Sequence, residues 1–303
     1  MRFRVFIAFA SILAAAQTVP ALNLNLHEGE SSFGFLKFSL SPRSIALGGA
    51  GVALVDGIAD ADVNPAAAVR DSGGIALGQG YPTAFAATGN YVSWNIPWQD
   101  RRVTVQARYL GYDNISGWGV NDDTTAAYGA HALKVQAGTA GNLWGFGYGV
   151  SLAFAQNNIA NVTYGAGLIN LGLWRELPYG LAAGFSLMNA DFWTSKAKDG
   201  SAIVPPTTIQ AGLAYSRGVP GNVRVSVATD VRKRNDEKIA YPAGVEATWL
   251  NMLSARIGYP FAEAEAAAAF GVGLHWSRYG FDYEYQGSAV ISGAHFWTLT
   301  IGY

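Results

Sequence analysis

The sequence has no cysteine, few charges and, beyond residue 21, no long apolar run. Without cysteine there are no disulfides and no thiolate metal sites. Charged residues make up 14% of the chain and the net charge is −1, so we predict no nucleic-acid partner, which would need a basic surface. A helix that spans a membrane needs about 20 predominantly apolar residues. A mature chain without such a run can cross a membrane only as a closed sheet, because open sheet edges leave backbone groups unpaired in lipid.

The amino terminus has the three parts of a secretory signal peptide. Arg2 and Arg4 form a positively charged start, and an apolar run follows from Val5 to Ala16. Small residues in Val19-Pro20-Ala21 supply a cleavage site, so we predict that residues 1–21 are removed and that the protein is exported. The alternative is an anchoring helix, for which the apolar run is short.

From Ser72 onward, apolar and polar residues alternate. Val223 and Val225 share one face of a predicted strand, whereas Arg224 and Ser226 share the other. This period of two is typical of a sheet with one apolar and one polar face. Fourteen such segments lie near residues 72–81, 88–97, 101–112, 131–139, 143–156, 162–176, 180–190, 207–217, 222–234, 238–250, 252–260, 266–278, 279–287 and 292–303. Pro242 within the tenth segment requires a bulge or a strand end, and residues 263–269 could instead form a helical turn.

The connections between these segments alternate between short and long. The longest run from Asp113 to Ala130 and from Asp191 to Thr207, and both are rich in polar residues and glycine. Bacterial membrane barrels have short periplasmic turns, long outer loops and an even number of strands. We therefore predict an all-β fold, a fourteen-stranded antiparallel transmembrane β-barrel over residues 72–303, located in the bacterial outer membrane. Residues 22–71 do not alternate and are predicted to form a compact, partly helical piece.

The last predicted strand ends on an aromatic residue. Trp297, Leu299, Ile301 and Tyr303 share one face, and Tyr303 is the final residue. This pattern resembles the signal that the barrel assembly machinery recognises, although phenylalanine is more common at the last position. The alternative is the last strand of a soluble sheet, as in a periplasmic β-sandwich binding module.

The segment FLKFSLSPRSIALGGAGVALVDGIADADVNPAAA, residues 35–68, carries a family resemblance. It resembles the opening stretch of the PorV/PorQ family, with Arg43, Gly48, Gly49 and Asn64-Pro65 at matching places. Ser41-Pro42 departs from the small residues usual there. Further matches in family order are Gly244-Val245-Glu246, Arg256-Ile257-Gly258-Tyr259, Gly271-Val272-Gly273, Phe281-Asp282-Tyr283 and His295.

The PorV/PorQ family is similar to the FadL-type transporters of long-chain fatty acids. The resemblance implies a barrel whose segment 22–71 folds inward as a plug. It also implies a non-enzymatic component of type IX protein secretion and cell-surface attachment. The alternative is a FadL-like passive transporter of hydrophobic compounds. The expected partners are outer-membrane lipid and lipopolysaccharide, the barrel assembly machinery, and secreted cargo or proteins of the attachment complex.

Strand parity places eight charged or titratable residues on the polar face, which would line the lumen. They are Lys134, Arg224, Asp230, Glu246, Arg256, His275, Asp282 and Glu284. Folding neighbouring strands back on each other sets Glu246 near Arg256 and His275 opposite Asp282. These residues could fix the register and fill a closed interior, or they could line a route or hold the plug.

Other clusters do not indicate catalysis. The glycines of residues 48–51 lack the Lys-Ser/Thr of a phosphate-binding loop. Asp56, Asp60 and Asp62 do not have the spacing of a calcium loop and are interpreted as a solvated turn. The four histidines are scattered and no nucleophile elbow is present, so we predict no cofactor, no metal and no enzyme activity. The mixed-charge run 232–238 is interpreted as a solvated outer loop or one that faces lipopolysaccharide.

Overall fold

The computed structural model describes residues 30–55, 57–70, 72–82, 87–118, 124–160, 162–197, 200, 202–263, 266–289 and 293–303. The predicted signal peptide, residues 1–21, lies outside these ranges, as do residues 22–29 of the predicted plug. No helix among the described residues is both long enough and apolar enough to cross a membrane.

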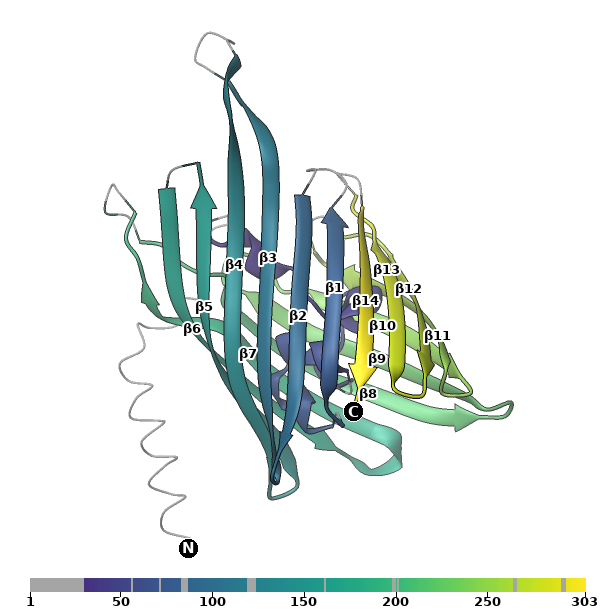
Figure 1. Ribbon diagram of the computed structural model, residues 1–303. Coiled ribbons are helices and arrows are strands. Elements are labelled where there is room, and N and C mark those ends of the chain that lie inside the picture. Colours follow the sequence, from purple (N-terminus) through teal and green to yellow (C-terminus); the bar gives the residue numbers. More distant parts are fainter. Residues whose placement is uncertain are drawn as a thin grey trace, which may run out of the picture.

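Fourteen antiparallel strands form one closed barrel, in which each strand pairs with its neighbours in sequence and β1 pairs with β14 (Figure 1). The strands are β1 (Gly74–Pro82), β2 (Ala87–Trp98), β3 (Arg101–Trp118), β4 (Thr124–Leu143), β5 (Phe146–Ile159), β6 (Val162–Glu176), β7 (Leu181–Thr194), β8 (Thr208–Val219), β9 (Val223–Arg234), β10 (Tyr241–Trp249), β11 (Leu253–Phe261), β12 (Ala269–Trp276), β13 (Tyr279–Gln286) and β14 (Ala294–Gly302). The predicted fold class is thus confirmed.

The two ends of the barrel differ in their connections. The loop end carries the longer ones, which include residues 195–207 and 235–240. The turn end carries short turns such as Trp144–Gly145 and Leu250–Met252, and the short 3-10 helix η5 (Pro178–Gly180). The first strand, β1, starts at this end, and the last strand, β14, finishes there. This sorting follows the prediction from the loop lengths.

One predicted loop is instead part of a hairpin. Residues 113–130 were expected to be a loop, but β3 continues to Trp118, and β4 begins at Thr124, which pairs with Trp118. This hairpin extends beyond the other strands at the loop end (Figure 1). The composition of the segment favours loops, but backbone pairing between adjacent antiparallel strands overrides that local preference. Pro242 is the second residue of β10, where the missing N–H costs the ladder little.

The outer face of the barrel is apolar, and much of its inner face is polar. On β11, Leu253 and Ile257 are 45% and 50% exposed, whereas Arg256 between them is 8% exposed. The outward side chains are apolar around the barrel, including Leu152, Leu213 and Val272. Apolar side chains outside and polar side chains inside are typical of a barrel that spans a membrane.

The amino-terminal segment lies inside the barrel. We call its described residues, 30–55 and 57–70, the plug. It contains the 3-10 helices η2 (Gly34–Lys37), η3 (Ile58–Asp62) and η4 (Pro65–Val69) and the short helix α2 (Pro42–Ala46). Helix η4 packs against β4, β5 and β6, and α2 packs against β11, β12 and β13. The plug therefore contacts opposite walls of the barrel.

The Ser41-Pro42 pair starts α2. The Ser41 hydroxyl accepts a hydrogen bond from the Ser44 amide at 3.1 Å, and Pro42 occupies the first helical position. Serine is a preferred N-cap, and proline at the first position loses no hydrogen bond. Ser41 and Pro42 thus produce a well-capped helix start.

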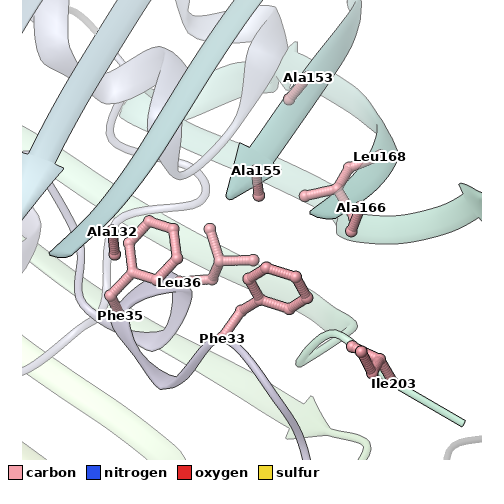
Figure 2. Packing of buried hydrophobic residues seen from close by; sticks show 9 residues of the cluster. All are labelled: Phe33, Phe35, Leu36, Ala132, Ala153, Ala155, Ala166, Leu168 and Ile203. Atoms are coloured by element: carbon pink, nitrogen blue, oxygen red, sulfur yellow. The ribbon is translucent and has the colours of Figure 1, made fainter. Parts of the chain in front are cut away.

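Near the loop end, the plug packs on an apolar part of the wall (Figure 2). Phe33, Phe35 and Leu36 of the plug contact a cluster of small and aliphatic wall residues. Its wall members are Ala132, Ala153, Ala155, Ala166 and Leu168, and Ile203 joins the cluster from the connection between β7 and β8. Near the loop end the lumen is therefore apolar along β5 and β6, whereas Lys134 of β4 and residues of β9–β11 and β13 are buried charges.

Candidate functional site: the plugged lumen

Asn64 and Pro65 connect the plug to the walls of β5 and β6. The Asn64 side chain donates to the carbonyl of Val52 at 2.8 Å and to that of Leu173 at 3.1 Å. Its oxygen accepts from the Ala66 amide at 3.0 Å, which caps η4. Asn64 is 0% exposed, so each of these hydrogen bonds is formed away from water. The Asn-Pro pair fixes both the local turn and its position in the barrel.

Glycines in the plug and wall permit backbone-to-backbone contact. Gly48 and Gly49 have φ values of 70° and 91°, a conformation that L side chains rarely adopt. A Cβ on Gly48 would clash with the backbone of Tyr259. On the wall, a Cβ on Gly258 would clash with the backbone of Leu47. Glycine is therefore needed on both sides of this contact.

A chain of ion pairs joins the plug to β10, β11 and β13. Arg43 donates to Glu246, which also accepts from Arg256 Nε at 2.7 Å. Arg256 Nη1 continues to Asp282 Oδ1 at 2.7 Å, and Asp282 Oδ2 lies 3.1 Å from His275 Nε2. Glu246, Arg256 and Asp282 are buried, and the chain ends at the half-exposed His275 near the turn end. Only the Arg43–Glu246 link reaches the plug, and the other links join wall strands, so the geometry contains features of both alternatives considered for these charges.

Three further predicted lumen residues, Glu284, Lys134 and Asp230, are buried on the inner face of the barrel. Glu284 is fully buried, and its carboxylate lies 3.5 Å from Arg256 Nη1. Lys134 approaches Asp62 of the plug at 3.5 Å. Asp230 accepts hydrogen bonds from the amides of Gly51 and Val52 at 2.8 and 3.0 Å. The Lys134 and Asp230 contacts connect wall and plug, whereas the Glu284 contact joins two wall strands.

Two predicted positions differ from the sequence-based expectation. Arg224 is on the inward-facing side by parity but is exposed, because it lies one residue from the start of β9 at the turn end. Asp282 pairs with Gly273 in the backbone register, so His275 reaches it diagonally and not from the opposite position. The turn between β12 and β13 is Ser277-Arg278, one residue earlier than predicted, which shifts the register.

The charged run 232–238 is not a solvated loop. Arg232, Asn235 and Asp236 are buried, and the run folds over the plug. Lys37 donates to Asp236 Oδ2 at 2.7 Å, and Ser31 donates to the same oxygen from its hydroxyl at 2.6 Å. A local charge pattern cannot show that a distant segment supplies the partners, so the interpretation as a solvated loop was wrong.

The acidic turn before Asn64 is also buried rather than solvated. Asp60 is 4% exposed and accepts from the Ser41 hydroxyl at 2.5 Å and from the Gly57 amide at 2.8 Å. Asp62 accepts from the Leu40 amide at 3.0 Å. These carboxylates act as internal caps of the plug. Within the described ranges, which omit Asp56, no group of three or more His, Asp or Glu residues could hold a metal ion.

Arg108 and Phe35 form a contact that the sequence analysis missed. Arg108 is buried on the inner face of β3, its guanidinium carbon lies 5.1 Å from the centre of the Phe35 ring, and it donates to the Phe38 carbonyl at 2.7 Å. Gln106 and Arg108 are two residues apart on one strand and therefore share its inner face, where both are buried. The alternation in the sequence could thus have identified Arg108 as a lumen residue. The aromatic partner could not be found, because the path of the plug is not encoded locally.

Two cavities lie between plug and wall. The upper cavity, at the loop end, has a volume of about 510 Å³, and its lining combines charged and polar side chains with apolar ones such as Leu36, Ile45 and Met188. The second is a mostly apolar pocket of about 70 Å³ between the plug and the wall of β1–β3 and β14, lined by side chains such as Phe35, Ile45, Leu110 and Phe296. Phe38, Ser39 and Ile45 line both cavities, so the two adjoin.

The geometry defines a class, namely a fourteen-stranded transmembrane barrel with an internal plug. No protein-family model and no curated protein sequence matches the chain. Among solved structures, the toluene transporter TodX of Pseudomonas putida is 12% identical, with a TM-score of 0.62 over 92% of this chain and 100% of that chain. The CymD monoaromatic hydrocarbon channel is 12% identical, with a TM-score of 0.59 over 90% and 99% of the two chains.

A Pseudomonas aeruginosa FadL homologue is 9% identical, with a TM-score of 0.54 over 86% of this chain and 98% of that chain. At these identities the likeness shows a common fold. The fold is thus shared with a FadL homologue and with hydrocarbon transporters, and none of these structures supports PorV/PorQ in particular.

Proposed function

We propose that the protein is a passive conduit of the bacterial outer membrane for small hydrophobic compounds, and that the plug closes it in this structure. The apolar pocket inside the lumen is the observation that carries the proposal, because a hydrophobic solute needs such a pocket and a protein-docking scaffold does not. Solved structures with this fold are described as hydrocarbon transporters and channels. The alternative expected from the sequence thereby becomes the main hypothesis, ahead of secretion and surface attachment.

The apolar pocket is too small for a substrate in this state. Its volume of about 70 Å³ compares with the roughly 150 Å³ of an engineered cavity that binds benzene. Its inner boundary is formed by Phe35 and Ile45 of the plug. A shift of the plug away from the wall would enlarge the pocket, so transport requires plug movement.

The upper wall of the lumen supports the same proposal. Phe33, Phe35 and Leu36 cover an apolar surface on β4–β6 that includes the fully buried Leu168 and Ala155 (Figure 2). When these plug residues leave, a hydrophobic solute can occupy the same surface, since burial of apolar area is favourable for either occupant. No energy source is needed, because the solute moves down its own gradient.

The expected partners remain predictions. An exported barrel with an apolar outer face would contact outer-membrane lipid and lipopolysaccharide and would be inserted by the barrel assembly machinery. Secreted cargo and attachment-complex proteins belong to the secretion role, for which the described geometry supplies no separate observation.

Uptake of toluene tests the proposal. Cells whose own hydrocarbon porins are deleted would express the full chain, and initial uptake of radiolabelled toluene would be compared with cells carrying an empty vector. We expect faster uptake with the protein. Leu110→Trp, which fills the apolar pocket from β3, should lower the rate towards the background. Val105→Trp is the matched control, because Val105 lies on the same strand but is exposed on the outer face.

The amount of each variant in the outer membrane would be measured by its heat-shifted band on gels. Uptake equal to the empty vector, with the protein present in the outer membrane, would overturn the proposed function. Equal loss in Leu110→Trp and Val105→Trp would show that the pocket is not on the path.

A further inference from the structure

The upper cavity places polar groups before the apolar pocket. It lies at the loop end, between the plug, the ends of β8 and β9 and the segment after β11. Its volume of about 510 Å³ is within the range of about 300–1,000 Å³ that holds small ligands. A compound that enters from the loop end meets this cavity first.

The charges that line this cavity neutralise one another. Four cations and four carboxylates form a set of internal ion pairs. The pairs are Lys37–Asp236 at 2.7 Å, Lys37–Glu237 at 3.1 Å, Lys134–Asp62 at 3.5 Å, Arg232–Glu263 at 2.8 Å, Arg234–Glu237 at 2.7 Å and Arg234–Glu263 at 3.2 Å. Lys238, also in the lining, is exposed at the rim. A charged ligand would lose water and find no spare opposite charge, which is costly.

The lining of the same cavity also contains uncharged hydrogen-bonding groups, some of which already have partners: Asn189 Oδ1 accepts from Lys134, Thr208 donates to the Pro206 carbonyl, and Gln210 donates to the Gly49 carbonyl and to Asp230. Side chains of Ser44, Asn189, Thr208, Gln210 and Gln286 form part of its lining. A hydroxyl group can donate to and accept from such groups, whereas a hydrocarbon would displace water there without replacing its hydrogen bonds. The lining is therefore complementary to a neutral polar group.

The two cavities meet at three residues of the plug. Phe38, Ser39 and Ile45 line both, so a polar end of a ligand can lie in the upper cavity while an apolar body reaches the pocket. Phe38 is 49% exposed and presents an aromatic ring at this junction. The arrangement favours a small molecule with one polar end and one aromatic or aliphatic body.

We propose that the conduit selects small, neutral, hydroxylated aromatic compounds, that is, aromatic alcohols and phenols, and discriminates against their anionic and cationic counterparts. This inference rests on the proposed function and narrows its substrate class. The charge pairs act as a filter, because the buried cations and carboxylates of the lining already lie beside opposite charges, while Lys238 adds a fifth cation only at the exposed rim.

Four probes of nearly equal size test the inference: toluene, benzyl alcohol, benzoate and benzylamine. Their initial uptake would be measured in porin-deleted cells that express the full chain, with the empty-vector rate subtracted. We expect benzyl alcohol to enter faster than toluene, and benzoate and benzylamine to enter about tenfold more slowly than benzyl alcohol, since an unpaired ion is costly to bury.

Removing one charge of a pair should change the selectivity in a defined direction. Glu263→Gln leaves Arg232 without its carboxylate partner and should raise benzoate uptake by about fivefold. Lys134→Met leaves Asp62 without its partner and should raise benzylamine uptake on a similar scale. Glu176→Gln is the control, because the Arg70–Glu176 pair is exposed and lies at the turn end, away from the cavity.

The outcomes separate this inference from the proposed function. If neither toluene nor benzyl alcohol enters faster than with the empty vector, the proposed function fails. If toluene enters but benzyl alcohol is slower, or benzoate is as fast as benzyl alcohol, the inference is overturned and the conduit stands. Heat-shifted bands would show whether each variant is folded. A folded Glu263→Gln protein with unchanged benzoate uptake would also count against the filter.

Discussion

Arg43 of the plug and Glu246 of β10 are joined by two hydrogen bonds, from Nε to Oε2 at 2.9 Å and from Nη2 to Oε1 at 2.5 Å. The same carboxylate accepts from Arg256 on β11 at 2.7 Å, so it is shared between plug and wall. Loss of the carboxylate would leave two guanidinium groups facing each other, the buried one of Arg256 and the partly buried one of Arg43. Loss of Arg43 would leave Glu246 with one partner.

We predict that Glu246→Gln weakens plug docking more than Arg43→Met does. Removing one partner of a buried ion pair costs about 3–5 kcal/mol, and Glu246 serves two partners, whereas Arg43 removal leaves the Glu246–Arg256 pair intact. The measurement is single-channel conductance in planar bilayers, where a displaced plug appears as more frequent or larger openings.

Glu176→Gln provides the control for this comparison, since its partner Arg70 is exposed and the pair contributes little. Equal conductance of Glu246→Gln and the unmodified protein would contradict the assigned role of the carboxylate. Larger openings in Arg43→Met than in Glu246→Gln would show that another contact of Arg43 contributes more to plug docking than its contact with Glu246.

The close contact of Gly258 with the plug gives a second prediction. A Cβ at Gly258 would clash with the backbone of Leu47, so Gly258→Ala should push α2 from the wall at a cost of about 1–3 kcal/mol. Gly218→Ala on β8 is the control, because nothing lies within 4 Å of its added Cβ. We expect increased conductance for the first variant alone. Unchanged conductance of the Gly258→Ala variant would show that the plug accommodates the added Cβ without opening the barrel.

The sequence was sufficient to predict the barrel, because strand parity is a local property. Alternation placed Glu246 and Arg256 on one face and opposite each other, and the register confirms this. It placed Asp282 on the inner face as well, but a turn one residue earlier than predicted moved its backbone partner to Gly273.

The plug contacts could not be predicted in the same way, because they join residues far apart in the chain. Lys37 and Asp236 are 199 residues apart, and neither local sequence indicates the other. Asp236 within a charged run has the pattern of a solvated loop until the plug supplies Lys37 and Ser31. For the same reason, the sequence predicted a lumen rich in charges, whereas Leu168 and its neighbours form an apolar part of the wall that only the position of Phe33 and Phe35 reveals.

The contact of Asp236 with the plug predicts a pH dependence. Burial raises the pKa of Asp236, but hydrogen bonds from Lys37 and Ser31 outweigh it and hold the pKa below its usual value. Because the pKa of Asp236 is lower in the folded protein than in the unfolded chain, its ionised carboxylate stabilises the docked plug. This stabilisation is complete above the pKa of the unfolded chain, about 3.9, and is lost as the pH falls through the pKa of the folded protein. We therefore expect residues 31–37 to stay docked at neutral pH and to detach only below about pH 4.

A fluorescent label can follow this detachment. The chain has no native cysteine, and Gly34 is exposed with nothing within 4 Å of an added Cβ, so Gly34→Cys gives one labelling site. Label anisotropy would be recorded from pH 7 downward, and it should fall only in the acid range. In an Asp236→Asn background the anisotropy should be lower at neutral pH and less dependent on pH. Loosening between pH 5 and 7 would contradict the assignment.

The final strand gives the last prediction. Leu299 is 47% exposed on the outer face, where its neighbours on the flanking strands are Leu77 and Phe281. Leu299→Asp would place a carboxylate against lipid, whereas Thr300→Asp would place one on the inner face of the same strand. We expect Leu299→Asp to reduce the heat-shifted, membrane-inserted fraction and Thr300→Asp to leave more of it intact.

Deletion of Tyr303 tests the predicted assembly signal at the same strand. The Tyr303 amide donates to the Gly73 carbonyl at 3.1 Å, and its hydroxyl accepts a hydrogen bond from Trp94. These contacts close the sheet at the turn end, so a merely structural role predicts a folded barrel of lower heat stability. A recognition role predicts less protein in the outer membrane with unchanged heat stability in the fraction that inserts. Normal membrane yield of both the Tyr303 deletion and Leu299→Asp would mean that the final strand is not the signal, because each change removes part of the pattern that assembly would recognise.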